Sequence, residues 1–183
     1  MADHKLVLHP ENPRAILQDP PELLESLRQL RLIGPSFNHL GELHHRAGPR
    51  FVELIHFNEG VIPPEGEEEA CHVALSETTE DAIFLGGGNA QAPSCPGCGH
   101  KVDGWRERLQ EWRLAPEQPG VCASCGRPRK AHELEWGRRG GFARYALDVW
   151  NVKEDEAVPS PELLELLRVV SYESWTYFYY RFP

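Results

Sequence analysis

The segment PELLESLRQL at residues 21–30 recurs as PELLELLRVV at residues 161–170, and seven of the ten positions are identical. Both copies begin with Pro and Glu, which are common in the first turn of a helix, and both carry leucines at helical spacing. The two segments therefore predict two amphipathic helices.

Strand-like runs flank both predicted helices. Residues 5–9 and 143–150 precede them, and residues 50–57 and 175–182 follow them. Two strand–helix–strand units predict an α+β fold, namely a ferredoxin-like antiparallel sheet with the helices packed on one face.

Two shorter apolar runs, at residues 71–75 and 82–85, are separated by polar residues and predict a hairpin that extends the sheet. The glycines at 86–88 then read as a flexible exit. They lack the G-x-G-x-x-G spacing of a dinucleotide site, so a phosphate-binding role is rejected.

Charge divides the chain into two parts. The net charge is −9, but residues 100–144 carry +4 and the remainder carries −13. Together with the cysteine spacing, this predicts a body formed by residues 1–90 and 142–183, interrupted by an insert at residues 91–141. The body is expected to repel nucleic acid and anionic lipid, and the insert could attract either. The alternative is that both sets of charges are simply solvated surface.

Four of the five cysteines form two C-x-x-C-G units, Cys95/Cys98 and Cys122/Cys125. Each unit makes a tight turn that directs two thiolates to one point, and the following glycine allows the backbone conformation that the turn needs. We expect one structural Zn²⁺ per chain, held by all four thiolates. The fifth cysteine, Cys71, lies in a strand-like run and is expected to be a buried apolar residue.

The two turns resemble the knuckles of zinc-ribbon and rubredoxin-type proteins, and the resemblance covers residues 94–128. Iron in a rubredoxin-like site is an alternative, because softness and geometry suit both metals. A thioredoxin-like redox pair would leave the second C-x-x-C unexplained. Disulfides are disfavoured for a chain without an export signal.

Between the cysteine pairs, Trp105, Leu109 and Trp112 share one face of a predicted helix whose N-cap is Asp103. We expect the tryptophans to cover the knuckles, with base stacking as the alternative. Basic residues in two glycine-bearing turns form a candidate nucleic-acid surface or, alternatively, solvated hairpin turns. These residues are Arg127, Arg129, Lys130, Arg138 and Arg139.

Histidines give a further candidate site. His39, His44 and His45 lie close together in the sequence, and such a group can bind a catalytic metal or act as a general base. The alternative is a loop whose imidazoles face water. No H-E-x-x-H, G-x-S-x-G or kinase motif occurs.

The last strand-like run is strongly aromatic. In a strand, Trp175, Tyr177 and Tyr179 share one face, and Tyr, Trp and Arg are typical of interaction hot spots. The sequence therefore suggests a partner-binding surface here, with burial in a central strand as the alternative.

These observations favour a non-catalytic, zinc-containing module that binds a protein partner. A nucleic-acid-associated factor that uses the basic insert is the second hypothesis, and a metal-dependent enzyme that uses the His39/His44/His45 region is the third. With no membrane span and no signal-like N-terminus, we expect a cytoplasmic protein.

Overall fold

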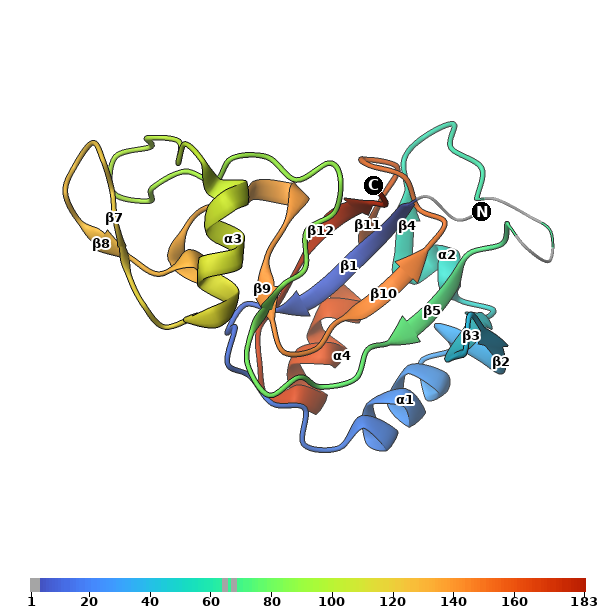
Figure 1. The fold of residues 1–183 in the computed structure, drawn as a ribbon. Helices are drawn as coiled ribbons and strands as arrows, with labels where there is room; N and C mark the ends of the chain where they lie inside the picture. The colour runs from blue at the N-terminus through green and yellow to red at the C-terminus, as the bar shows by residue number, and fades with distance from the viewer. Residues whose placement is uncertain (1–3, 64–65, 67–68) are drawn as a thin grey trace.

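The computed structural model describes residues 4–63, 66 and 69–183. The fold is mixed α+β, and its centre is a six-stranded antiparallel sheet in the order β12-β1-β10-β5-β3-β2. Figure 1 shows the strands of this sheet beside the helices α1 (Pro20–Gln29) and α4 (Pro161–Ser171). The strands are β1 (His4–Pro10), β2 (Ile33–His39), β3 (Glu42–Ala47), β5 (His72–Leu75), β10 (Leu147–Trp150) and β12 (Trp175–Arg181).

The repeated segments form helices, as predicted. Helix α1 spans Pro20–Gln29 and helix α4 spans Pro161–Ser171. Each begins with proline after a capping side chain, because the Asp19 carboxylate accepts from the Glu22 N–H and the Ser160 hydroxyl from the Leu163 N–H. The likeness of the two segments therefore extends to the way their helices begin.

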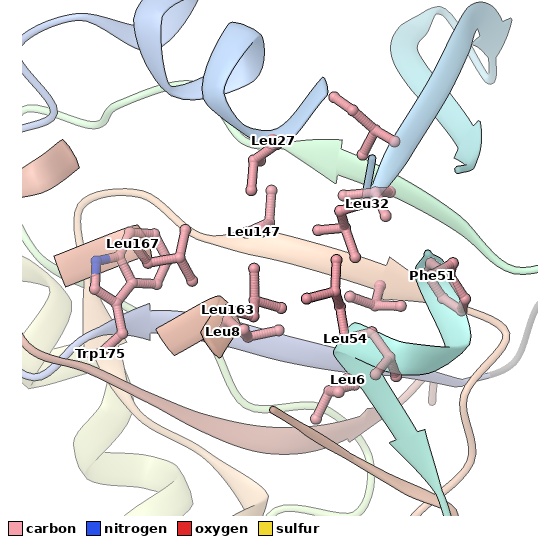
Figure 2. Close-up of a cluster of buried hydrophobic side chains, with 14 of the residues drawn as sticks. Leu6, Leu8, Leu27, Leu32, Phe51, Leu54, Leu147, Leu163, Leu167 and Trp175 are labelled. Atoms are coloured by element: carbon pink, nitrogen blue, oxygen red, sulfur yellow. The ribbon is translucent and has the colours of Figure 1, made fainter. Parts of the chain in front are cut away.

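The main hydrophobic core lies between these helices and one face of the sheet. Leu27 and Leu167 project from the two helices toward Leu8 and Leu147 on the central strands, and all four are fully buried (Figure 2). Each such side chain contributes about 1.5–3 kcal/mol through burial. This apolar layer fixes which face of the sheet the helices cover.

Residues 50–57, which the sequence suggested as the strand after α1, lie outside the main sheet. The next strand of that sheet after α1 is β2, followed by β3 and β5. Residues 51–57 instead form the short helix α2 (Phe51–Leu54) and the strand β4 (Ile55–Phe57), which pairs with β11 (Ala157–Pro159) outside the main sheet. Phe51 and Leu54 are both buried at a spacing of three residues, which suits a helical turn rather than a strand.

The predicted hairpin of residues 71–75 and 82–85 is wrong. Strand β5 pairs with β10 and β3, whereas β6 (Ile83–Phe84) pairs with β9 (Phe142–Ala143). The intervening chain stays alongside the segment before β10, because Ser76 and Thr79 donate their N–H groups to the carbonyls of Ala146 and Arg144. It therefore never turns back on β5.

A second hydrophobic cluster lies in the segment between β6 and β9. The helix α3 (Trp105–Leu114) supplies Trp105 and Trp112, which pack with Trp136 and Phe142. The helix starts at Gly104 in a left-handed conformation, not at an Asp103 cap as the sequence suggested. The strands β7 (Gly120–Val121) and β8 (Pro128–Arg129) form a small hairpin beside α3 (Figure 1).

Both ends of the six-stranded sheet are obstructed. The outer edge of β12 is bonded to Asn89, which donates to the Tyr179 carbonyl and accepts from the Arg181 N–H. Gly88 donates to the Arg181 carbonyl, and a Cβ at the preceding Gly87 would lie 2.3 Å from that oxygen. These glycines therefore permit a close backbone approach and are not the flexible exit that the sequence suggested.

At the opposite end, β2 contains Pro35, which has no N–H to donate. Its pairing with β3 is also irregular between Ile33 and Ser36. The outer edge of β2 therefore lacks a continuous row of bonding groups.

Across the described part of the chain, no helix combines the length and apolar character needed to cross a membrane.

Candidate metal centre

The two C-x-x-C-G units fold into equivalent turns. In the first, Gly99 donates its N–H to the Cys95 carbonyl, and in the second Gly126 donates to the Cys122 carbonyl. Both glycines have positive φ, 72° and 69°, which side chains with a Cβ rarely adopt. The glycine requirement that the sequence suggested is therefore present in both turns.

The two turns bring four sulfur atoms together. The ligand atoms of Cys95, Cys98, Cys122 and Cys125 all lie within 4.8 Å of one another. Two of these approaches link one turn to the other, at 3.9 Å for Cys95–Cys125 and 3.7 Å for Cys98–Cys122. Sulfurs placed about 2.3 Å from a tetrahedral zinc ion are about 3.8 Å apart. The cluster therefore has the dimensions of a four-thiolate metal site.

Backbone N–H groups prepare two of the thiols for deprotonation. The N–H groups of Cys125 and Ser124 lower the pKa of Cys122 to about 6, and the Gly97 N–H lowers the pKa of Cys95. Since the thiolate is the form that binds metal, these N–H groups favour the binding-competent state.

Two of the candidate nucleic-acid-binding residues lie beside this centre. A Cβ built on Gly97 would be 3.3 Å from both Arg127 Nη1 and Arg129 Nη2, so the two guanidinium groups stand over the first knuckle. Four thiolates around a divalent ion carry a net charge of −2, which two nearby arginines offset.

The other three basic candidates have partners within the chain. Lys130 pairs with Glu117 at 2.5 Å, and Arg139 pairs with Glu154 at 2.5 Å. Arg138 donates to the Tyr177 carbonyl at 2.8 Å, and its guanidinium lies 3.9 Å from the centroid of the Tyr177 ring. The five basic residues thus do not form one unpaired surface.

The aromatic strand β12 lies mostly inside the protein. Trp175 and Tyr179 belong to the main core and are 6% and 3% exposed, and the Tyr179 hydroxyl donates to the Ala157 carbonyl. Tyr177 is half-buried under Arg138. Helix α4 covers the side of β12 that carries Trp175 and Tyr179, so these two side chains face the main core.

The three candidate histidines are separated by the pleat of the sheet. His44 and His45 are consecutive on β3, so they project to opposite faces, and both are buried (1% and 2% exposed). A loop with imidazoles in water, the alternative reading of the sequence, is therefore wrong. His39, on β2, lies with His44 and also with His72 on β5. His72 joins this group only through strand pairing, and nothing in its local sequence signals it.

The remaining cysteine is isolated from the centre. Cys71 is buried in the main core, and burial raises its pKa to about 12. Its placement agrees with the expectation of a buried apolar residue.

No family model, curated protein or solved structure matches this chain.

Proposed function

We propose that the protein is a non-catalytic, cytoplasmic zinc-containing module that binds a protein partner, and that one structural Zn²⁺ is held by Cys95, Cys98, Cys122 and Cys125. The observation that carries the metal assignment is the cross-paired set of sulfur distances, 3.7 and 3.9 Å. Four thiolates fill a tetrahedral shell and leave no position for water or substrate, which favours a structural role.

We also propose that residues 1–90 and 142–183 form a ferredoxin-like body and residues 91–141 a zinc-ribbon insert. The strand order β12-β1-β10-β5 supports the first part, because numbering these four strands along the chain gives the order 4-1-3-2 of two interleaved strand–helix–strand units. The second hydrophobic cluster, with three tryptophans, supports the second part.

A protein partner is favoured over nucleic acid by charge. The chain carries −9 overall, and three of the five basic candidates are engaged within the molecule. Arg127 and Arg129 are the basic residues that favour the nucleic-acid alternative. A salt-dependent shift of labelled RNA or DNA, lost when both are changed to glutamate, would identify that alternative instead.

Elemental analysis of the full chain, purified without added metal, tests the metal assignment. We expect about one zinc per chain in the wild type and in Cys71→Ser, and loss of that zinc in Cys98→Ser. The matched pair is informative because Cys71 lies outside the sulfur cluster. Iron in place of zinc, or equal zinc in the two variants, would contradict the proposal.

The partner role is tested by affinity capture from nuclease-treated extract of the native host, with the wild type and Cys98→Ser as paired baits. A protein retained by the metal-bound chain and lost with Cys98→Ser supports a metal-organised binding module. The proposal would be contradicted if the treated extract yields no bound protein while the same extract without nuclease yields only nucleic acid.

A further inference from the structure

The sheet face opposite the two helices carries a row of polar and aromatic side chains. Pairing places Lys5 opposite Trp150 and Trp150 opposite His72, so these three residues share one face across β1, β10 and β5. The next pair in the row is His72 with Arg46 of β3. This face is distinct from the leucine-lined face that packs on the helices.

The β2–β3 hairpin curls over this row. The His39 ring on β2 lies 5.6 Å from the Trp150 ring on β10, although two strands separate β2 from β10. In a flat sheet those strands would be about 14 Å apart, so the hairpin must bend toward the face. The bend encloses His39, His44 and His72.

The spacing of the three imidazoles matches that of three rings bound to one metal ion. Their centroids are 4.9 Å (His39–His44), 4.9 Å (His44–His72) and 5.1 Å (His39–His72) apart. A metal–nitrogen bond of about 2.1 Å puts each centroid about 3.2 Å from the ion, so octahedral to tetrahedral angles separate the centroids by roughly 4.5–5.2 Å.

Ring rotation would turn the histidine nitrogens toward one point. Among the described residues, the four cysteines are the one group whose ligand atoms already lie close enough together to hold a metal ion. The centroid of an imidazole lies close to its Cβ–Cγ axis, so rotation about χ2 redirects both nitrogens and leaves the centroid spacing nearly unchanged. The strands fix the spacing of the ring centroids, whereas rotation about χ2 of each histidine costs little energy.

Two nitrogens in the cluster are buried without a partner. They are Nδ1 of His44 and Nε2 of His72, whose side chains are 1% and 5% exposed. A buried polar atom left unbonded costs about 1–3 kcal/mol, and an ion bound by both nitrogens would remove that cost. His72 Nδ1 lies 3.1 Å from the Ala70 carbonyl, which fixes the proton on Nδ1 and leaves a lone pair on Nε2.

The surroundings of His44 and His72 favour the neutral form of these two rings, which is the form that binds metal. Burial, followed by the neighbouring histidines His72, His39 and His45 and by Lys5, lowers the pKa of His44 to about 4. Burial also lowers the pKa of His72. The nearest carboxylate oxygen to His44 Nε2 belongs to Glu42, at 4.0 Å.

We propose that His39, His44 and His72 form a second metal site, which binds one divalent first-row transition-metal ion through three imidazoles and leaves at least one coordination position open. The site is independent of the cysteine cluster, and it excludes His45, which projects to the opposite face. Imidazole ligands suit Zn²⁺, Ni²⁺ and Cu²⁺ rather than Mg²⁺ or Ca²⁺.

Calorimetric titration of the full chain with Zn²⁺, after the cysteine site is loaded and excess metal dialysed away, tests the proposal. We expect one further equivalent in the wild type and in His56→Gln, a matched control because His56 is exposed and away from the cluster. His39→Gln and His72→Gln should each lower the affinity for the second zinc by at least about tenfold. Removing only a hydrogen-bond partner of a metal ligand already costs about that much affinity, and removing the ligand itself should cost no less.

Native mass spectrometry of the same samples counts the ions and shows whether the first zinc is retained. If the buried His72→Gln variant does not fold, the half-exposed His39→Gln variant decides the matter. No second equivalent in the wild type, or a second equivalent that persists unchanged in His39→Gln, would overturn the proposal. If a sample lacks only the first zinc, the cysteine assignment is contradicted. The ions bound at the second site are still counted separately.

Discussion

Replacing Arg138 with alanine separates a structural role of the basic turns from a nucleic-acid-binding one. The Arg138 guanidinium donates to the Tyr177 carbonyl at 2.8 Å and to the Thr176 hydroxyl at 3.1 Å, and it lies 3.9 Å from the Tyr177 ring centroid. Its loss would leave the outer edge of β12 without one of its partners.

The expected cost follows from those contacts. A hydrogen bond to the strand carbonyl is worth about 1 kcal/mol, and a cation–π contact at an exposed site adds about 0.5–1 kcal/mol. Arg138→Ala should therefore lower the free energy of unfolding by about 2 kcal/mol. For a chain of this size, that is roughly a 4–8 °C fall in Tm.

Urea and thermal unfolding, followed by circular dichroism, measure the effect. Arg113→Ala is the matched control, since Arg113 is an exposed residue of α3, and it should change stability by less than about 0.5 kcal/mol. A change below about 0.5 kcal/mol for Arg138→Ala, or an equal loss in both variants, would refute the reasoning.

Two further predictions concern the main core. Burial raises the pKa of both Tyr145 and Tyr179 to about 12, so these phenols should stay protonated at pH 11 and ionise near pH 10 only after unfolding. Because the pKa is higher in the folded state, the contribution of these phenols to stability is complete below pH 10 and is lost as pH rises through 12. A tyrosinate absorbance titration measures this. If Tyr145→Phe and Tyr179→Phe remove no ionisation step near pH 12, the prediction is contradicted. Leu167→Ala should cost about 2–5 kcal/mol in a denaturant titration, whereas Val169→Ala, on the exposed side of the same helix, should cost little, and equal losses would argue against the placement of α4.

The features that could be predicted from the sequence are those set by local spacing. The leucines of residues 21–30 and 161–170 encode helices through their periodicity, and each C-x-x-C-G unit encodes its own turn. The residues that form β12 could likewise be read from its aromatic run, although its place at the end of the sheet could not. These elements need no information about distant residues.

The pairing of strands could not be read in the same way, because it depends on residues far apart in the chain. Residues 50–57 have strand-like composition, but Phe51 and Leu54 are buried through a helical turn. Residues 71–75 look like one half of a local hairpin, yet their partners are β10 and β3.

The same limit applies to the candidate sites. His39, His44 and His45 are neighbours in the sequence, but the alternation of side chains along β3 removes His45, and strand pairing brings in His72. Burial of Trp175 and Tyr179 depends on the position of α4, which the composition of the strand alone does not reveal.

The obstructed ends of the sheet bear on how this molecule meets others. An open strand edge is a template for backbone pairing with a second chain, which can propagate into fibrils. Here Asn89 and Gly88 occupy one margin, and Pro35 interrupts the other. Self-association by adding strand to strand is therefore disfavoured at the β12 edge, where a partner would have to recognise side chains rather than extend the sheet.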